Sequence, residues 1–158
     1  MTDNIKSVLF VCTGNSCRSP MAEGLLKKYL KELGKDYIEV RSAGVGTMDD
    51  LAPTDSTIEV MKRTGIDVSG YRSKRLTDDL IRRADLILVM EEAHRVEVIR
   101  RVPEAKSKTY LIKEFGIGDR TYDPEGISIP DPIGRPVKDY ERCLEMIKIQ
   151  IERIAEIL

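Results

Sequence analysis

The sequence predicts an α/β fold: one domain, with four parallel strands in a doubly wound sheet and helices on both faces. Short apolar segments such as Val8–Val11 and Asp85–Met90 show no polar alternation, which is typical of strands buried on both faces of a parallel sheet. Segments with helical periodicity separate them. A chain of 158 residues is long enough to form one core, so we expect a single domain over residues 1–158.

The first half of the chain alternates predicted strands and helices. Pro20 suits the first turn of a helix, where its missing N–H costs nothing, and Ser19 suits the N-cap just before it. Gly34 ends this helix. The expected elements are a strand at 8–11, a helix at 20–33, a strand at 37–41 and a helix at 55–64.

The second half continues the alternation. Thr77 is a good N-cap, because Asp78 and Asp79 in the following turn favour the helix dipole, and Pro103 ends a later helix. Apolar residues at spacings of three and four predict a long final helix, and packing on its own sheet is favoured over a coiled-coil dimer. The expected elements are a helix through 84, a strand at 85–90, a helix at 91–102, a strand at 108–112 and a helix at 140–158.

This topology predicts where a ligand binds. Right-handed crossovers bring Cys12, Ser42 and the loops after Met90 and Ile112 to one edge of the sheet, where open α/β sheets bind ligands. The segment 113–136 is rich in Gly, Pro and Asp, and a loop of this length in a compact domain is usually functional.

Composition excludes several classes of protein. The net charge of −1 gives no reason to expect nucleic acid or an acidic membrane surface as a partner. No apolar segment approaches the length of a membrane span, and Met1–Lys6 does not resemble a signal peptide. Three cysteines do not form a disulfide framework, so we expect a cytoplasmic protein. Cys12, Cys17, Cys143 and His94 lack the spacing of a zinc site; we expect Cys143 in the core and His94 on the surface.

The segment from Cys12 to Arg18 joins a predicted strand to a predicted helix and carries the chemistry. A cation at a helix N-terminus is unfavourable on its own, but a bound phosphate-sized anion would face Arg18, the helix dipole and the free backbone amides together. The same field favours a thiolate at Cys12. The loop therefore combines a nucleophile with an anion receptor.

Cys12-x5-Arg18-Ser19-Pro20, so near the N-terminus, resembles the signature loop of the low-molecular-weight protein tyrosine phosphatase family. The resemblance implies a phosphatase that works through a phosphocysteine on Cys12, with no metal or cofactor. It implies that Arg18 and the loop amides bind phosphate, that Ser19 hydrogen-bonds the nucleophile, and that Asn15 and Ser42 support the loop. Cys17 would form a reversible disulfide with Cys12, or simply fill the back of the loop. The phosphate-binding residues are Thr13, Gly14, Asn15, Ser16, Cys17 and Arg18.

The reaction also needs a carboxyl group to protonate the leaving group and then activate water. Two Asp-Pro pairs lie in the long loop, at Asp123 and at Asp131. In the family the acid precedes a final helix that contains a tyrosine, and Asp131-Pro132 followed by Tyr140 matches this arrangement. We therefore expect Asp131 to be the acid and Asp123 to be a turn residue.

The expected substrate is a phosphorylated protein, and phosphotyrosine is favoured. Ile133 and Gly134 stand where tyrosine-specific members usually carry tyrosines, and Ser16 stands where the protein-arginine phosphatase branch carries threonine, so arginine dephosphorylation is the alternative. An arsenate reductase is disfavoured because no cysteines follow the third predicted strand. Retention of a nucleophile and an acid disfavours a non-catalytic phosphate-binding module. We expect a monomer or a weak dimer.

Overall fold

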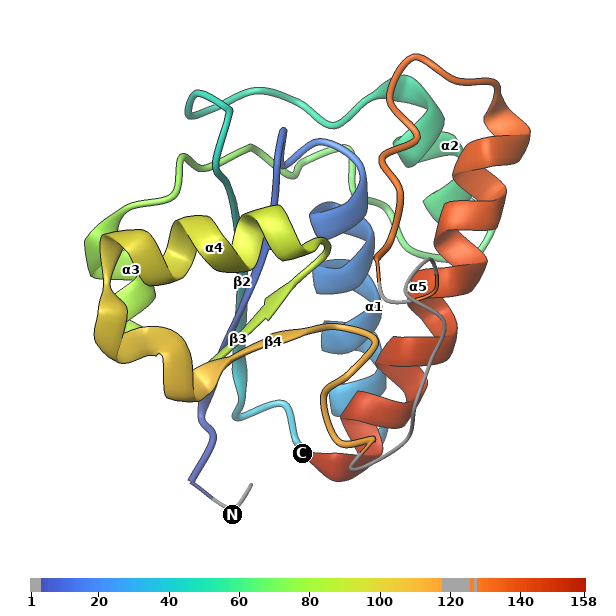
Figure 1. Cartoon of the computed structure of the whole chain (residues 1–158). Coiled ribbons are helices and arrows are strands. Elements are labelled where there is room, and N and C mark those ends of the chain that lie inside the picture. The colour runs from blue at the N-terminus through green and yellow to red at the C-terminus, as the bar shows by residue number, and fades with distance from the viewer. Residues whose placement is uncertain (1–3, 118–125, 127) are drawn as a thin grey trace.

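The chain folds around a parallel sheet with strand order β2-β1-β3-β4. A computed structural model describes residues 4–117, 126 and 128–158 (Figure 1). Each pair of neighbouring strands is parallel, which confirms the predicted sheet. The strands are β1 (Ser7–Cys12), β2 (Glu39–Gly44), β3 (Leu86–Val89) and β4 (Thr109–Leu111).

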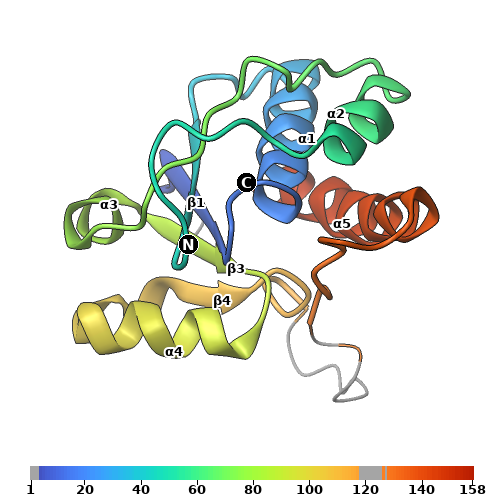
Figure 2. The ribbon, with the colours of Figure 1, turned by 90° about the horizontal axis from the view of Figure 1, so that it is seen from above.

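Helices cover both faces of the sheet, as predicted (Figure 2). One apolar cluster joins Phe10 of β1 to the helices on one face, and a second joins Val11, the next residue of β1, to the helices on the other. The first face carries α1 (Arg18–Glu32), α2 (Asp55–Lys62) and α5 (Val137–Ile157). The second carries α3 (Asp78–Arg83), α4 (Glu92–Arg101) and a short 3-10 helix, Pro103–Lys108.

The long helix α5 packs on its own domain rather than presenting its apolar stripe to solvent. Its buried residues include Tyr140, Leu144, Ile147 and Ile151, which join the same cluster as Leu25 of α1. Figure 1 shows α5 beside α1 on one face of the sheet. No helix in the described part of the chain has both the length and the apolar character of a membrane span.

Two of the predicted boundaries that differ from the structure lie next to the Cys12 loop. The second strand starts at Glu39 and extends through Gly44, because Tyr37 is 67% exposed whereas Ser42, Ala43 and Gly44 pair with β1. Helix α1 begins at Arg18, with Cys17 at the N-cap and no side-chain cap. Ser19 therefore lies inside the first turn, where its hydroxyl contacts Cys12 instead of capping the helix.

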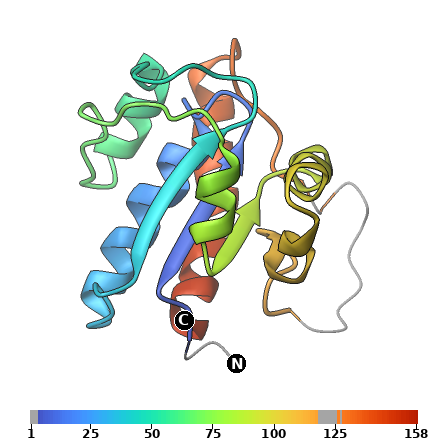
Figure 3. The ribbon, with the colours of Figure 1, turned by 90° about the vertical axis from the view of Figure 1, so that its left-hand side faces the viewer.

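The carboxyl ends of the strands meet at one edge, as expected (Figure 3). Cys12 lies opposite Gly44 in the β1–β2 pair, and Val11 lies opposite Val89 in the β1–β3 pair. The segment after β4 returns to the same edge, since the Ile129 N–H donates to the Met90 carbonyl at 2.9 Å. Residues from the ends of three strands can therefore form one site.

Candidate functional site

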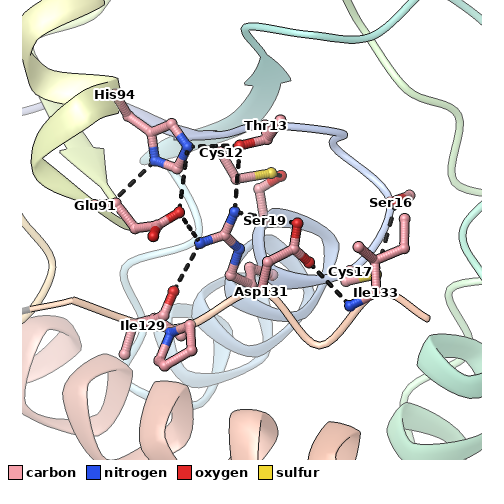
Figure 4. Close-up of polar contacts among 12 residues, drawn as sticks. Cys12, Thr13, Ser16, Cys17, Ser19, Glu91, His94, Ile129, Asp131 and Ile133 are labelled. Atoms are coloured by element: carbon pink, nitrogen blue, oxygen red, sulfur yellow. Dashed lines mark hydrogen bonds and ion pairs between the residues drawn. The ribbon is translucent and has the colours of Figure 1, made fainter. Parts of the chain in front are cut away.

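Cys12 is the last residue of β1, and its thiol lies inside the turn that leads to α1 (Figure 4). The residue is only 2% exposed. The Asn15 N–H donates to the Cys12 sulfur at 3.2 Å, and the Ser19 hydroxyl lies 2.8 Å from the same sulfur. The loop thus surrounds the thiol with hydrogen-bond donors.

The Asn15 side chain determines which way the Ser19 hydroxyl points. Asn15 adopts the left-handed conformation (φ 53°) that asparagine tolerates, and its Oδ1 accepts the Lys74 N–H at 2.8 Å. Its Nδ2 then donates to Ser19 Oγ at 2.6 Å and to Ser42 Oγ at 3.0 Å. Because Ser19 accepts from Asn15, its own hydrogen is free to point at the sulfur. The structure thus brings Asn15, Ser19 and Ser42 together.

The residues at the end of β2 and just after it are hydrogen-bonded to the backbone of the Cys12 loop. The Val45 and Gly46 N–H groups donate to the carbonyls of Cys12 and Thr13, each at 2.9 Å. A Cβ at Gly44 would lie 2.6 Å from the Thr13 carbonyl oxygen and 3.0 Å from Asn15 Cβ. Only glycine allows this close approach, so the end of β2 shapes the back of the loop.

Arg18 is buried, at 1% exposure, and its guanidinium is held from three sides. Nη1 donates to Glu91 Oε2 and to the Ile129 carbonyl, both at 2.7 Å. Nη2 donates to Thr13 Oγ1 at 3.4 Å. A buried guanidinium fixed in this way presents a rigid positive charge beside the Cys12 loop.

Asp131 faces the same guanidinium (Figure 4). Its Oδ2 lies 3.6 Å from Arg18 Nη2, and its Oδ1 accepts the Ile133 N–H at 3.1 Å. The side chain is 33% exposed, so it remains accessible to a ligand. Asp123, the other candidate acid, lies outside the described residues.

Burial raises the pKa of the Cys12 thiol above its usual value, whereas the sequence predicted a lowered pKa. The expectation neglected the cost of burying a charged sulfur. The Ser19 hydroxyl, the Arg18 charge and the backbone amides of Ser19 and Asn15 act in the opposite direction and favour the thiolate. The sulfur is therefore buried among groups that stabilise its ionised form.

Sequence reasoning missed several partners of the site. Ser42 donates to Glu23 Oε1 at 3.0 Å and contacts the Tyr71 hydroxyl. Glu91 pairs with Arg18, and its position directly after Met90, at the carboxyl edge of the sheet, was the signal that could have identified it. Tyr71 and Glu23 carried no such signal, because nothing in the local sequence places them near Ser42.

His94 is buried rather than on the surface, which corrects the prediction from its charged neighbours. It is 2% exposed, and its ring lies between Glu91 and the Thr13 hydroxyl. Burial, followed by the charge of Arg18, lowers the pKa of His94 to about 4, although Glu91 and Asp131 act in the opposite direction. The imidazole is therefore neutral at pH 7.

This pKa predicts acid sensitivity. Between pH 6.5 and about 4 the unfolded chain binds a proton at His94 that the folded protein excludes, so stability rises with pH and is lost as pH falls through this window. We expect the exclusion of this proton from His94 to lower the free energy of unfolding by about 3 kcal/mol as the pH falls from 6.5 to about 4. Urea unfolding of wild type and His94→Asn at pH 4 and pH 7 measures it. An equal pH dependence in both proteins would contradict the prediction.

A strand-to-helix turn that encloses a buried thiol and ends in a fixed guanidinium is characteristic of the cysteine-dependent phosphatases. Residues 7–158 match the family described as low molecular weight phosphotyrosine protein phosphatase, and the chain belongs to that family.

Two curated relatives and one solved structure illustrate the similarity. The chain is 38% identical over 144 residues to the probable low molecular weight protein-tyrosine-phosphatase EpsP of Ralstonia nicotianae, covering 91% of this chain and 90% of the relative. It is 38% identical over 149 residues to a protein-arginine-phosphatase of Geobacillus stearothermophilus, covering 94% and 93%. The crystal structure of a low molecular weight protein tyrosine phosphatase from T. tengcongensis superposes with a TM-score of 0.86, at 38% identity and 96% and 99% coverage.

Proposed function

We propose that this chain is a protein phosphatase that hydrolyses phosphotyrosine, with Cys12 as nucleophile and Asp131 as general acid and base. The observation that carries the proposal is the convergence of three groups on one space. Cys12 lies inside the loop, Arg18 closes its end, and the Asp131 carboxyl group lies 3.6 Å from the guanidinium. Family membership supports the same reaction.

In the first step, the Cys12 thiolate attacks phosphorus, an S–P bond forms and the P–O ester bond breaks, while Asp131 gives its proton to the leaving oxygen. In the second, the Asp131 carboxylate takes a proton from water. The oxygen of that water attacks phosphorus, and the S–P bond breaks to release phosphate and the thiolate. Arg18 and the backbone amides of residues 13–18 stabilise the phosphoryl oxygens. Ser19 and the Asn15 N–H stabilise the sulfur as it leaves.

Comparison of kcat/KM for matched phosphotyrosine and phosphoarginine peptides tests the substrate. The proposal expects the phosphotyrosine peptide to be the better substrate. Hydrolysis of neither peptide would contradict a protein phosphatase.

Arginine dephosphorylation is the second candidate, because aliphatic side chains stand at two described positions where tyrosine-specific members of the family usually carry aromatic residues. Ile133, after the proposed acid, is 55% exposed, and Met48, in the loop after β2, is 69% exposed. Ser16 brings a small hydroxyl to the loop, within 3.7 Å of the Cys17 sulfur. One of the relatives is named as a protein-arginine-phosphatase.

Residue 16 provides a direct test of specificity. Ser16→Ile adds apolar bulk, so we expect it to raise the ratio of phosphotyrosine to phosphoarginine kcat/KM by about tenfold, the value of one or two buried methylenes. Ser16→Thr keeps the hydroxyl and is the matched control, with an expected change below about threefold. The same ratio in all three proteins would show that residue 16 does not discriminate between the substrates.

We also propose that Cys17 protects Cys12 from irreversible oxidation. Peroxide would convert the Cys12 thiolate to a sulfenic acid, and attack by the Cys17 thiol would release water and form a disulfide. Both thiols are free and buried. Mass spectrometry after mild peroxide treatment should show a Cys12–Cys17 bond, and Cys17→Ser should give sulfinic acid at Cys12. Sulfinic acid at Cys12 in wild type would contradict this role.

The remaining expectations concern the setting of the protein. We propose a cytoplasmic enzyme that acts on phosphorylated proteins as a monomer or weak dimer. Its three cysteines are free, which suits a reducing compartment. Sedimentation at several protein concentrations measures the oligomeric state.

A further inference from the structure

His94 connects helix α4 to the phosphate-binding loop (Figure 4). Its Nδ1 accepts the Glu91 N–H at 3.1 Å, so the neutral ring carries its proton on Nε2. Nε2 lies 2.9 Å from Thr13 Oγ1 and therefore donates to it. One ring thus makes two different contacts: it caps the start of α4 and holds the residue that follows Cys12.

The bond to Thr13 determines what the threonine hydroxyl can do. Thr13 Oγ1 accepts from His94 and, at 3.4 Å, from Arg18 Nη2. A hydroxyl oxygen has two lone pairs and one hydrogen, so both acceptor positions are used. Thr13 is consequently fixed against the guanidinium, and its own hydrogen can be donated to an anion in the loop.

The other contact fixes the second partner of the guanidinium. Glu91 Oε2 lies 2.7 Å from Arg18 Nη1 and 3.8 Å from His94 Nε2. The Glu91 backbone is held by the bond from its N–H to the same ring. Both residues that orient Arg18 from this side, Thr13 and Glu91, are thus attached to His94.

We propose that His94 is a positioning residue for phosphate binding, which acts by holding the Thr13 hydroxyl and, through it, the Arg18 guanidinium. The inference rests on the proposed function of the same site. It assigns to His94 a contribution to anion affinity rather than to proton transfer, because Asp131 supplies the proton. The charged groups that face the ring are Arg18, Glu91 and Asp131.

The alternative is that His94 only caps α4 and fills space. Substitution of His94 by asparagine or by glutamine distinguishes the positioning role from the capping role. The Oδ1 of asparagine takes the place of the ring Nδ1, and the Nε2 of glutamine takes the place of the ring Nε2. His94→Asn keeps an acceptor for the Glu91 N–H but does not reach Thr13. His94→Gln keeps a donor for Thr13 but loses the acceptor at Glu91.

The experiment measures the dissociation constant of inorganic phosphate by calorimetry, together with kcat and KM for an aryl phosphate. We expect His94→Asn to bind phosphate about tenfold more weakly, because the loss of one hydrogen bond weakens binding by about this factor. KM should rise by a similar factor, and kcat should change less. His94→Gln should stay within about threefold of wild type in both constants. Val96→Ala, at an exposed position of α4, is the control and should match wild type.

Wild-type phosphate affinity in His94→Asn, or equal losses in both amide variants, would overturn the proposal. If His94→Asn unfolds, His94→Gln decides alone: retained affinity supports the proposal, and tenfold weaker binding contradicts it. The binding assay also separates this inference from the proposed function. A wild-type protein that binds phosphate but hydrolyses no phosphopeptide would refute the function and still allow His94 to be tested.

Discussion

Replacement of Cys12 by serine is expected to abolish the hydrolysis of aryl phosphates, with kcat lower by at least about 10⁴-fold, as for other enzymes that lose their nucleophile. A serine hydroxyl is not ionised near neutral pH, and the His94 ring does not serve as its base, because it is bonded to Thr13 and Glu91 rather than to residue 12. Steady-state rates with p-nitrophenyl phosphate measure the effect.

The control for this substitution removes a different thiol. Cys143 lies on α5 and is 4% exposed, and its sulfur lies 4.0 Å from the Pro130 carbonyl. Cys143→Ala should retain kcat within about threefold, since among the described residues no hydrogen bond joins the Cys143 sulfur to Cys12 or Arg18. Phosphate should still raise the melting temperature of Cys12→Ser, and this result would show that the variant keeps a folded phosphate-binding site. Substantial turnover by Cys12→Ser would refute the phosphocysteine mechanism.

Substitution of Asp131 by asparagine is expected to lower kcat by about 10²- to 10⁴-fold, the usual contribution of a general acid or base. The loss should be larger for phosphotyrosine than for p-nitrophenyl phosphate, because nitrophenolate leaves without a proton more readily than the tyrosine phenolate. The pH profile supplies a second measurement, since the limb that reports the acid should disappear from kcat/KM.

Two other aspartates test this assignment. Asp139 and Asp131 both line a cavity of about 230 Å³, but Asp139 has no contact with Arg18 among the described residues. Asp139→Asn should therefore keep nearly full activity. Asp123→Asn should also retain turnover. If Asp123→Asn lost activity and Asp131→Asn kept it, the roles of the two Asp-Pro pairs would be reversed.

Most of the fold could be predicted from the sequence, because the patterns are local and strong. The apolar segment that ends at Cys12 has one stable location, in the middle of a parallel sheet, and the stripe from Tyr140 to Leu158 has one side to bury. The position of Thr77 as a cap was confirmed by its bond from the Leu80 N–H at 3.1 Å. Continuous apolar segments and the helical period can be recognised in the sequence itself, so these features could be predicted without knowing the tertiary contacts.

The errors arose where a tertiary contact outweighs a local preference. Ser19 has the chemistry of a cap, but the proximity of Cys12 and Asn15 directs its hydroxyl to the sulfur. His94 stands among charged residues that face solvent, yet its own side chain turns inward to Thr13, 81 positions away in sequence. No periodicity in α4 reports that contact, because the partner belongs to another loop.

Arg18 links two tasks that are usually assigned to separate residues. Its Nη1 holds the Ile129 carbonyl, two positions before Asp131, while its charge serves the anion. In the proposed mechanism, recognition of the phosphoryl group by Arg18 and delivery of the proton by Asp131 are therefore coupled through the Arg18 side chain. Lysine would preserve the charge, but its single nitrogen lacks the planar fork that here spans Glu91, Ile129 and Thr13. The enzyme consequently needs the shape of arginine at this position as much as its charge.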